Sequence, residues 1–421
     1  GFQKCNNLNF EKMSFTTNMK IMAELWSDAI KIIAKGSVDV VSLDFARAFD
    51  KVDHGILLSR IKSLNITGKI GIWIYQFLTG RMQYVSVGDE RSNPTAIVSG
   101  VPQGTVLGPI LFLILLTTID MNVKTSFTSS FADDTKLAST IMNALDAENF
   151  QRDLDSVYKW ADSSNMQFNG DKFQLLRYGQ DELLKQTTSY TDCNGNSISV
   201  TTNAKDLGIL MSSDGGFVDH IMSVVQKATQ MSGWVLRTFY TRERQPMLTL
   251  YKALILSRLD YCSALWNPND SAYLIDKIES VQRSFTRKIS SMDGLNYWER
   301  LDSLRLYSVQ RRRERYVIMY VFKILHGLVP NCGLTFQENA RTGIRAVVPK
   351  LNIGLTSHVK KLRSNSFNYV APMLYNILPN DMRKIYIANE PFKLFKQDLD
   401  TLLSTVRDEP DRLRLNSECK K

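Results

Sequence analysis

The segment SFTSSFADDTKLA, Ser126–Ala138, places the adjacent carboxylates Asp133 and Asp134 between two runs that alternate as β-strands do. Such alternation on both sides of a polar pair predicts a hairpin with the aspartates at or near its turn. A second segment, VDVVSLDF at Val38–Phe45, predicts a buried strand that has Asp44 on one face and apolar neighbours packed behind it. A hairpin beside this strand would bring Asp133 close to Asp44.

Carboxylates at the ends of neighbouring strands are suitable ligands for hard divalent ions. Mg²⁺ takes carboxylate and carbonyl oxygens and keeps several waters. Two such ions, roughly 4 Å apart, stabilise both the attacking and the leaving oxygen of an in-line displacement at phosphorus. Each feature alone has a simpler explanation, because Asp-Asp is common in turns and Asp44 is able to cap a following helix. Other segments must therefore decide between these interpretations.

Three further segments follow in a fixed order. Ser99–Pro109, SGVPQGTVLGP, is a loop whose glycines would let the backbone and the amide of Gln103 approach a base pair. Phe168–Tyr178, FNGDKFQLLRY, places Lys172 before an apolar strand, where a lysine is able to protonate or neutralise a leaving pyrophosphate. Lys205–Met211, KDLGILM, predicts a short strand with one glycine, suited to the close approach of a backbone.

The ordered set LDFARAFDKVDH, SGVPQGTVLGP, FADDTKL, FNGDKFQLL and KDLGILM resembles the reverse transcriptase of a non-LTR retrotransposon of the jockey or CR1 type. The resemblance continues into LYKALILSRLDYCSALWNP and IESVQRSFTRKI and so covers most of the chain. It implies an α+β fold: a right-hand polymerase palm of split βαβ, ferredoxin-like topology with partial fingers, then a helical thumb and a mostly helical C-terminal extension. It also implies an RNA-directed DNA polymerase, a nucleotidyltransferase that extends a DNA 3′ end on an RNA template.

The resemblance implies a metal-binding role for the carboxylates. Asp44 and Asp133 would be the main ligands of two Mg²⁺ ions, with Mn²⁺ as a substitute, and Asp134 a supporting catalytic carboxylate. The carbonyl of Phe45, beside the nucleotide, would be a further ligand. Adjacent strand residues face opposite ways, which makes Asp134 the weaker candidate. Lys172 would serve the pyrophosphate.

Other motif residues would contact the substrates. Phe49 matches an aromatic residue under the incoming sugar, where a flat ring clashes with a 2′-hydroxyl; outside its motif it would be read as a core phenylalanine. Gln103 and Gly104 would position nucleotide and template. Leu207 and Gly208 would contact the primer end. The expected partners are therefore an RNA template, a DNA primer and deoxynucleoside triphosphates.

Bulk composition agrees with these partners. The chain has 421 residues, of which 44% are hydrophobic and 22% charged, as in globular proteins. Its net charge of +10 favours phosphate-rich partners.

Five scattered cysteines without a C-x-x-C pair favour a reducing compartment and disfavour structural zinc. The apolar run Val106–Ile119 is too short to cross a bilayer, and the start has no signal peptide, so we expect a nuclear and cytoplasmic protein without membrane contact. The oligomeric state stays open.

We expect a residual fingers segment at 1–37, the palm at 38–215 with fingers-side helices at about 55–98, the thumb at 216–330 and a C-terminal extension at 331–421. Within the palm, Asn143–Ser163 predicts an amphipathic helix with Leu145 and Trp160 on its apolar side. Basic residues of the thumb are expected to track a duplex backbone: Arg283, Arg287, Lys288, Arg311, Arg312, Arg313 and Arg315.

Two alternatives remain. The chain opens at Gly1-Phe2-Gln3, with glutamine where the family has arginine, and we expect the fingers strands before it, and an endonuclease domain, to be missing. The first alternative is thus a truncated, catalytically impaired remnant that only binds nucleic acid. An RNA-templated RNA polymerase is the second, and Phe49 disfavours it.

Overall fold

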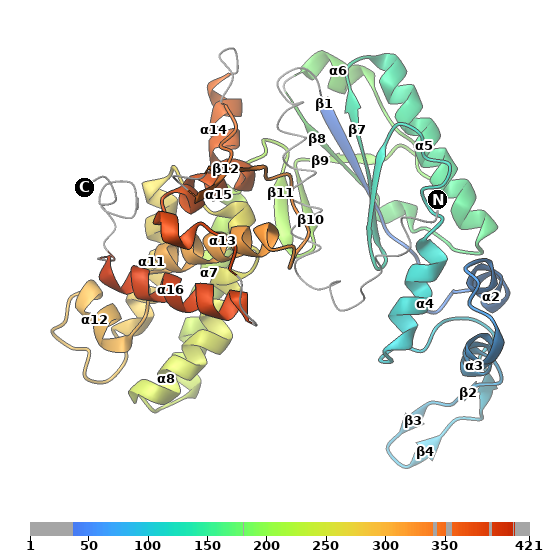
Figure 1. Ribbon diagram of the computed structural model, residues 1–421. Coiled ribbons are helices and arrows are strands. Elements are labelled where there is room, and N and C mark those ends of the chain that lie inside the picture. Colours follow the sequence, from blue (N-terminus) through green and yellow to red (C-terminus); the bar gives the residue numbers. More distant parts are fainter. Residues whose placement is uncertain are drawn as a thin grey trace. The chain divides into compact units, whose positions relative to one another are not determined.

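The structure is a computed structural model that describes residues 37–179, 181–339, 343–350, 356–386, 390–406 and 408. It divides into two compact units, Lys35–Ala204 and the described residues of Lys205–Lys421, and each is described by itself (Figure 1). Apart from Ser37, the expected fingers segment at 1–37 lies outside the described residues. The boundary between the units falls inside a strand, between Ala204 and Lys205.

A five-stranded sheet in the order β6-β7-β1-β8-β9 forms the centre of the first unit. The chain enters this sheet in its middle, because β1 pairs antiparallel with both β7 and β8. β6 adds an antiparallel edge, and β9 is parallel to β8. These strands are β1 Ser37–Leu43, β6 Phe127–Phe131, β7 Asp134–Ile141, β8 Gln174–Tyr178 and β9 Ser199–Thr201.

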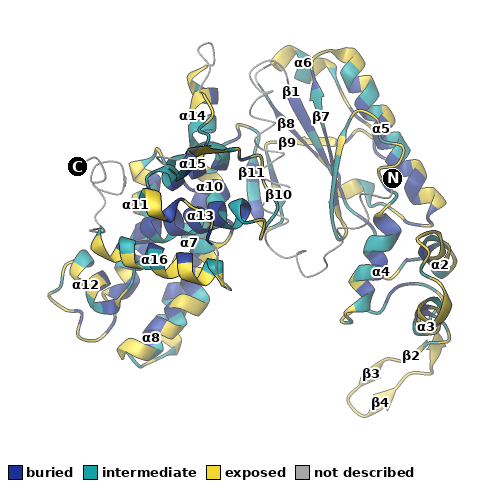
Figure 2. Cartoon of the chain, viewed as in Figure 1, coloured by how far each residue is buried: buried dark blue, intermediate teal, exposed yellow. Residues whose placement is uncertain are grey.

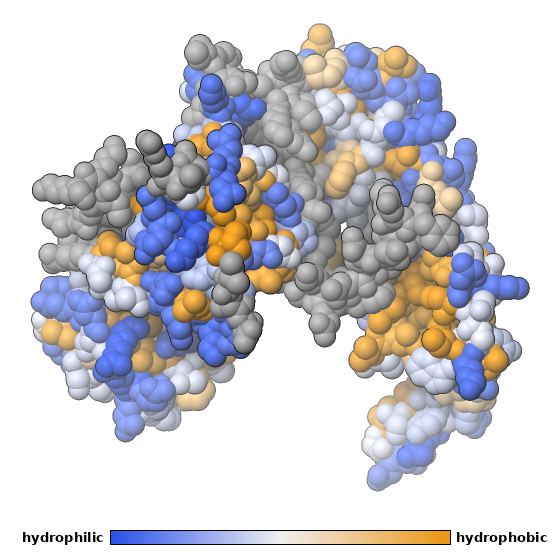
Figure 3. Space-filling model, viewed as in Figure 1, coloured by the Kyte–Doolittle hydropathy of each residue, from blue (hydrophilic) through white to orange (hydrophobic). Residues whose placement is uncertain are grey.

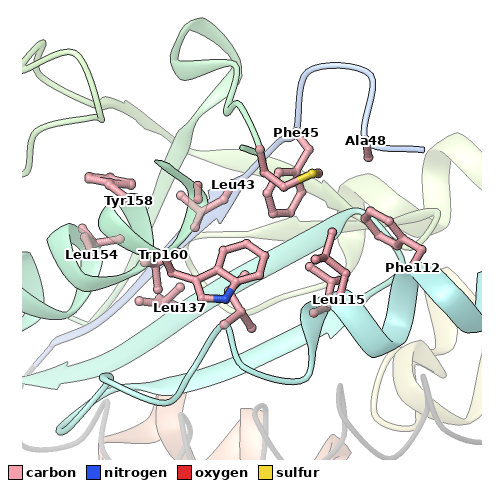
Figure 4. Close-up of a cluster of buried hydrophobic side chains, with 14 of the residues drawn as sticks. Leu43, Phe45, Ala48, Phe112, Leu115, Leu137, Leu154, Tyr158 and Trp160 are labelled. Atoms are coloured by element: carbon pink, nitrogen blue, oxygen red, sulfur yellow. The ribbon is translucent and has the colours of Figure 1, made fainter. Parts of the chain in front are cut away.

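Helices α4 and α5 pack on one face of this sheet, and their side chains form one core with it (Figure 4). Leu43 and Phe45, which flank Asp44, are buried in this core, as predicted. The predicted helix at 143–163 is confirmed, with Asn143 as its N-cap; Trp160 is buried, but Leu145 is 59% exposed. The helices of the unit are α2 His54–Ser63, α3 Gly68–Leu78, α4 Leu107–Leu116, α5 Ala144–Ser163 and α6 Glu182–Thr187.

The residues between α2 and α4 are more exposed to solvent than those of the sheet (Figure 2). α3 buries only Ile74 and Leu78, while Trp73 and Tyr75 are exposed. Two short hairpins follow, β2 with β5 and β3 with β4, and all eight of their residues are exposed. Hydrophobic surface is also visible over α4 (Figure 3). The hairpin strands are β2 Met82–Gln83, β3 Ser86–Val87, β4 Glu90–Arg91 and β5 Thr95–Ala96.

The second unit is mainly helical. It begins within β10, Asn203–Asp206, which forms a hairpin with β11, Ile209–Ser212. The prediction of a single strand over Lys205–Met211 is therefore wrong: Leu207-Gly208 is a turn between two strands. The helices up to the expected end of the thumb are α7 Val218–Thr238, α8 Arg244–Leu250, a π-helix at Tyr251–Leu256, α9 Ser257–Asp260, α10 Ser263–Trp266, α11 Ala272–Thr286, α12 Tyr297–Leu304 and α13 Val309–Leu325.

Later elements pack against α13. Phe322 of α13 stacks on Phe395 of α16, with ring centroids 4.1 Å apart, in a core that also contains α15 side chains. These elements are β12 Phe336–Asn339, β13 Gly343–Ala346, α14 Ser357–Asn365, α15 Phe367–Asn376, a 3₁₀ turn at Asn380–Met382 and α16 Pro391–Thr405.

The arginine run of α13 is not the surface that the sequence suggested. Arg311 and Arg313 are 0% and 1% exposed, and Arg315 is 9% exposed. Arg315 Nη2 donates to Asp400 Oδ2 of α16 at 2.8 Å, and Arg312 Nε donates to Asp260 Oδ2 at 2.7 Å. The prediction that these arginines track a duplex is therefore wrong, because their charges face partners inside the second unit.

Candidate active site

The two carboxylate segments meet at one end of the sheet. β1 pairs with β7 from Ser37 opposite Ile141 to Leu43 opposite Thr135. One more step in this register places Asp44 opposite Asp134, with Asp133 beside it in the turn. The predicted hairpin is thus confirmed, with Ala132 and Asp133 as the two residues between the paired Phe131 and Asp134.

The hairpin turn has an uncommon backbone conformation. Ala132 has a φ of 52°, in the left-handed region, which costs an L-residue about 1–2 kcal/mol. Residues held in such conformations cluster at functional sites, where the surrounding structure enforces them. The paired strands β6 and β7 supply that enforcement here. Asp133 and Asp134 are both exposed.

The backbone carbonyl of Phe45 points to the side of β1 on which β7 lies. Asn169 donates its amide to the Asp44 carbonyl, and Ala46 donates its amide to the Gln167 carbonyl, both at 2.8 Å. Backbone groups of successive strand residues point to alternate sides. The carbonyl of Phe45 therefore points away from these partners, toward the side of β1 on which β7 lies. Its ring packs in the core, stacked on Phe168 with centroids 4.4 Å apart.

Lys172 lies at this end of the sheet as well. It closes a 3₁₀ turn, Gly170–Lys172, directly before β8. Its Nζ lies 3.1 Å from Asp44 Oδ2, with the lysine side chain 63% exposed and the aspartate side chain 35% exposed. The structure thus joins Lys172 to Asp44 and places Phe45, Asp133 and Asp134 at the same end of the sheet, after β1 and before or at the start of β7.

The nucleotide residues form a second group around the loop before α4. Gln103 Nε2 donates to Asp50 Oδ1 at 2.9 Å, which ties the loop to the residue after Phe49. Phe49 is half-buried and stacks on the buried Phe112, with centroids 4.7 Å apart. Gly104 is exposed. Phe49 is therefore partly a core residue, as its alternative interpretation held.

A glycine permits this close approach of two motifs. Gly100 has a φ of 86°, and a Cβ atom there would lie 2.8 Å from the Asp50 carbonyl oxygen. The Gly100 amide donates to the Val52 carbonyl at 2.8 Å. Any larger residue would separate the loop from the segment that follows β1.

A groove of about 550 Å³ lies beside this contact, lined by Asp50, Gln103 and residues of β2 and β5. Arg81, which the sequence analysis did not single out, also lines it and donates to the Gly100 carbonyl at 2.9 Å. Arg81 belongs to none of the sequence motifs. Its position directly after Gly80, just beyond the end of α3, indicates only a turn residue. Arg81 thus adds a cation to a groove that also contains the Asp50 carboxylate.

Asp153 of α5 is another residue that sequence reasoning missed. This 3% exposed carboxylate accepts hydrogen bonds from Thr125 and Ser126, from the backbone amide and hydroxyl of each, and from the Lys124 amide. Burial alone would raise its pKa, but these hydrogen bonds outweigh burial and lower the pKa. Asp153 thereby fixes the loop from which β6 and the carboxylate hairpin start.

The donor set at the end of β1 consists of oxygens only, the type that hard divalent ions take. Among the described residues, no group of three or more His, Cys, Asp or Glu side chains lies close enough to hold a metal ion. Within the same part of the chain, no helix is long and apolar enough to cross a membrane.

Comparison with known proteins agrees with this geometry. Residues 3–209 match the family described as reverse transcriptase (RNA-dependent DNA polymerase). The RNA-directed DNA polymerase from mobile element jockey of Drosophila funebris is 30% identical over 269 residues, which cover 59% of this chain and 28% of that protein. Its counterpart from Drosophila melanogaster is 28% identical over 264 residues, with the same two coverages. The chain thus spans little more than a quarter of the length of these relatives.

A solved telomerase structure from Candida albicans aligns with a TM-score of 0.33 at 12% identity, over 67% of this chain and 49% of that one. The match places residues 3–209, about half of the chain, in the reverse transcriptase family. Its similarity to the jockey polymerases agrees with the resemblance to non-LTR retrotransposon reverse transcriptases.

Proposed function

We propose that this chain is an RNA-directed DNA polymerase that extends a DNA 3′ end on an RNA template by two-metal phosphoryl transfer. The observation that carries the proposal is the meeting of the carboxylate hairpin with the end of β1, where Lys172 Nζ lies 3.1 Å from Asp44. In this proposal the first unit supplies palm and fingers-side elements, and the second unit supplies a helical thumb and the C-terminal extension.

Asp44, Asp133 and the Phe45 carbonyl would hold two Mg²⁺ ions, with Asp134 in support. When bound, the ions would supply charge stabilisation for the attacking 3′ oxygen and the leaving pyrophosphate. Continued one step past Leu43–Thr135, the register of β1 and β7 would set Asp134 opposite Asp44, whereas Asp133 lies in the hairpin turn. This register supports a larger role for Asp134 than strand alternation alone suggested.

Lys172 would change partner during the cycle. Without metal, its ammonium group neutralises Asp44. Its side chain is mostly exposed and flexible, so release from Asp44 requires little desolvation. Released from Asp44, the ammonium group would be able to protonate or neutralise the leaving pyrophosphate.

Phe49, Gln103 and Gly104 would form the nucleotide side of the site. Phe112 supports the Phe49 ring from behind, so that a sugar above the ring meets a rigid surface. Arg81 and Gln103 line the same groove and would contact the triphosphate or the template strand. Leu207 and Gly208 of the second unit would contact the primer end.

The test is primer extension by the purified chain on an RNA template, with an annealed DNA primer, deoxynucleotides and Mg²⁺. We expect primer lengthening that a chelator abolishes and added Mg²⁺ or Mn²⁺ restores. A folded chain that binds the primer–template duplex but never lengthens the primer, under any metal, would overturn the proposal.

A further inference from the structure

The turn of the β10–β11 hairpin has a backbone that its sequence does not favour. Leu207 and Gly208 have φ angles of 45° and 86°, so both lie in the left-handed region. A two-residue hairpin turn with this geometry normally contains Asn or Gly at its first position, because a bulky side chain crowds the backbone there. A leucine in this place requires that other contacts hold the turn.

Tyr261, in the break between α9 and α10, makes those contacts. Its hydroxyl donates to the Leu207 carbonyl at 2.8 Å. Its ring lies against Gly208, because a Cβ atom on this glycine would lie 3.5 Å from Tyr261 Cε1. The next residue, Cys262, has a φ of 50°, and this local reversal lets Tyr261 leave the helical path. Tyr261 is 39% exposed.

Buried side chains fix Tyr261 from below. Trp266, 1% exposed, donates its indole Nε1 hydrogen to the Tyr261 carbonyl at 2.9 Å. The guanidinium of buried Arg313 lies over the Trp266 ring, 4.2 Å from its centroid, and donates to the Leu259 carbonyl at 2.7 Å. Tyr261 is thus held by the buried side chain of Trp266, which packs in turn against Arg313 of α13.

Trp266 also holds the second strand of the hairpin. His220 of α7 packs edge-on against Trp266, with centroids 5.1 Å apart. Its Nδ1 accepts a hydrogen bond from the Leu210 amide at 3.2 Å. The turn, through Tyr261, and β11, through His220, are therefore both anchored on Trp266.

We infer that Tyr261 is a positioning residue for the primer 3′ end: it holds the Leu207–Gly208 turn in the conformation that meets the primer. This inference rests on the proposed function, because it assigns the turn to primer contact. The turn offers backbone groups in a fixed direction, and a misplaced primer terminus slows the chemistry steeply. Without the tyrosine hydroxyl, the leucine would favour other backbone conformations.

The test compares Tyr261→Phe, which removes only the hydroxyl, with Tyr240→Phe, a control on a side chain that is 95% exposed. Two readouts are measured on the full chain: single-nucleotide addition to a primer on an RNA template, and amide hydrogen exchange at 207–210. We expect Tyr261→Phe to lower kcat by about tenfold, with KM for the nucleotide unchanged. We also expect faster exchange at the turn and an unchanged Tm.

Equal kcat and equal exchange in the two variants would overturn the inference. Faster exchange with an unchanged kcat would also overturn it, since the turn would then be held but not used. If the wild-type chain adds no nucleotide, the proposed function is wrong. Amide hydrogen exchange at 207–210 then still shows whether Tyr261 holds the turn. Gly208→Ala provides a second variant: its Cβ at positive φ should slow nucleotide addition without removing the Tyr261 hydroxyl.

Discussion

Lys172 and Asp44 form an ion pair of 3.1 Å between the end of β1 and the 3₁₀ turn before β8. Two segments that are far apart in the sequence, and that also pair through their backbones at Asp44–Asn169 and Ala46–Gln167, therefore share a pair of opposite charges. The pair is solvent-exposed, and exposed ion pairs contribute about 0–1 kcal/mol to stability. Because the ion pair contributes little to the stability of the fold, we expect Lys172 and Asp44 to serve the reaction.

Lys172→Gln tests that conclusion. We expect the free energy of unfolding to change by less than about 1 kcal/mol, while the rate of nucleotide addition falls by about 10²-fold or more, as for loss of a positioned acid. Lys62→Gln, at an exposed lysine of α2, is the control. Denaturant unfolding and primer extension give the two quantities, and a large loss of stability with normal extension would assign Lys172 to folding.

Phe49→Val tests sugar selection. The smaller side chain should admit a 2′-hydroxyl, so the ratio of ribonucleotide to deoxyribonucleotide incorporation should rise by about tenfold or more. Because Phe49 also stacks on Phe112, we expect a loss of stability of about 1–3 kcal/mol. Phe239→Val, in the second unit, controls for loss of an aromatic side chain. An unchanged ratio would mean that Phe49 is only a core residue.

The α13 arginines should differ from the exposed bases of α11 and the residues after it. Arg313→Gln removes a buried cation and should destabilise the chain by about 3–5 kcal/mol. Arg287→Gln, at an exposed position, should leave stability unchanged and, if the thumb binds the duplex, reduce the salt dependence of binding by about one ion. Thermal unfolding measures the stability of each variant, and salt titrations measure its binding to the duplex. If Arg313→Gln were as stable as the wild-type chain but bound the duplex weakly, Arg313 would be a duplex-binding residue.

His220 should make stability depend on pH. Burial, with help from the charges of Lys227 and Arg313, lowers its pKa to about 4 from a usual value of 6.5. The folded state thus favours the neutral ring, so this contribution is fully present above about pH 6.5 and is lost as pH falls toward 4. A difference of this size corresponds to up to about 3 kcal/mol.

The measurement is the difference in unfolding free energy between the wild-type chain and His220→Gln from pH 4 to 7. A difference is needed because burial raises the pKa of Glu314 to about 8, which makes its contribution to stability fall as pH rises over part of the same range. The wild-type advantage should shrink as pH falls. A constant difference would show that His220 titrates normally in the folded chain.

Local patterns in the sequence predicted the centre of the site. Alternation in Val38–Phe45 and around Asp133 predicted a strand and a hairpin, and β1 and β7 bury Leu43 and Leu137 in the core that they share with α4 and α5. The apolar period of the segment at 143–163 predicted α5. These predictions succeeded because each depends on neighbours within a few residues.

Long-range contacts explain what the sequence did not reveal. Arg315 resembles a surface residue until Asp400 is placed beside it, and Tyr261 has no visible link to Leu207. The sequence does not reveal the turn at Leu207-Gly208, because leucine is rare at positive φ. The roles of the individual site residues and the domain limits stay predictions.

The most direct test of the two-metal account is primer extension on an RNA template by the wild-type chain, Asp133→Asn and Asp120→Asn. Asp133 lies in the carboxylate turn, whereas Asp120 is an exposed aspartate in the loop after α4. We expect extension by the wild-type chain and by Asp120→Asn, and a loss of at least about 10³-fold for Asp133→Asn with unchanged folding. Equal extension by all three chains would contradict the account.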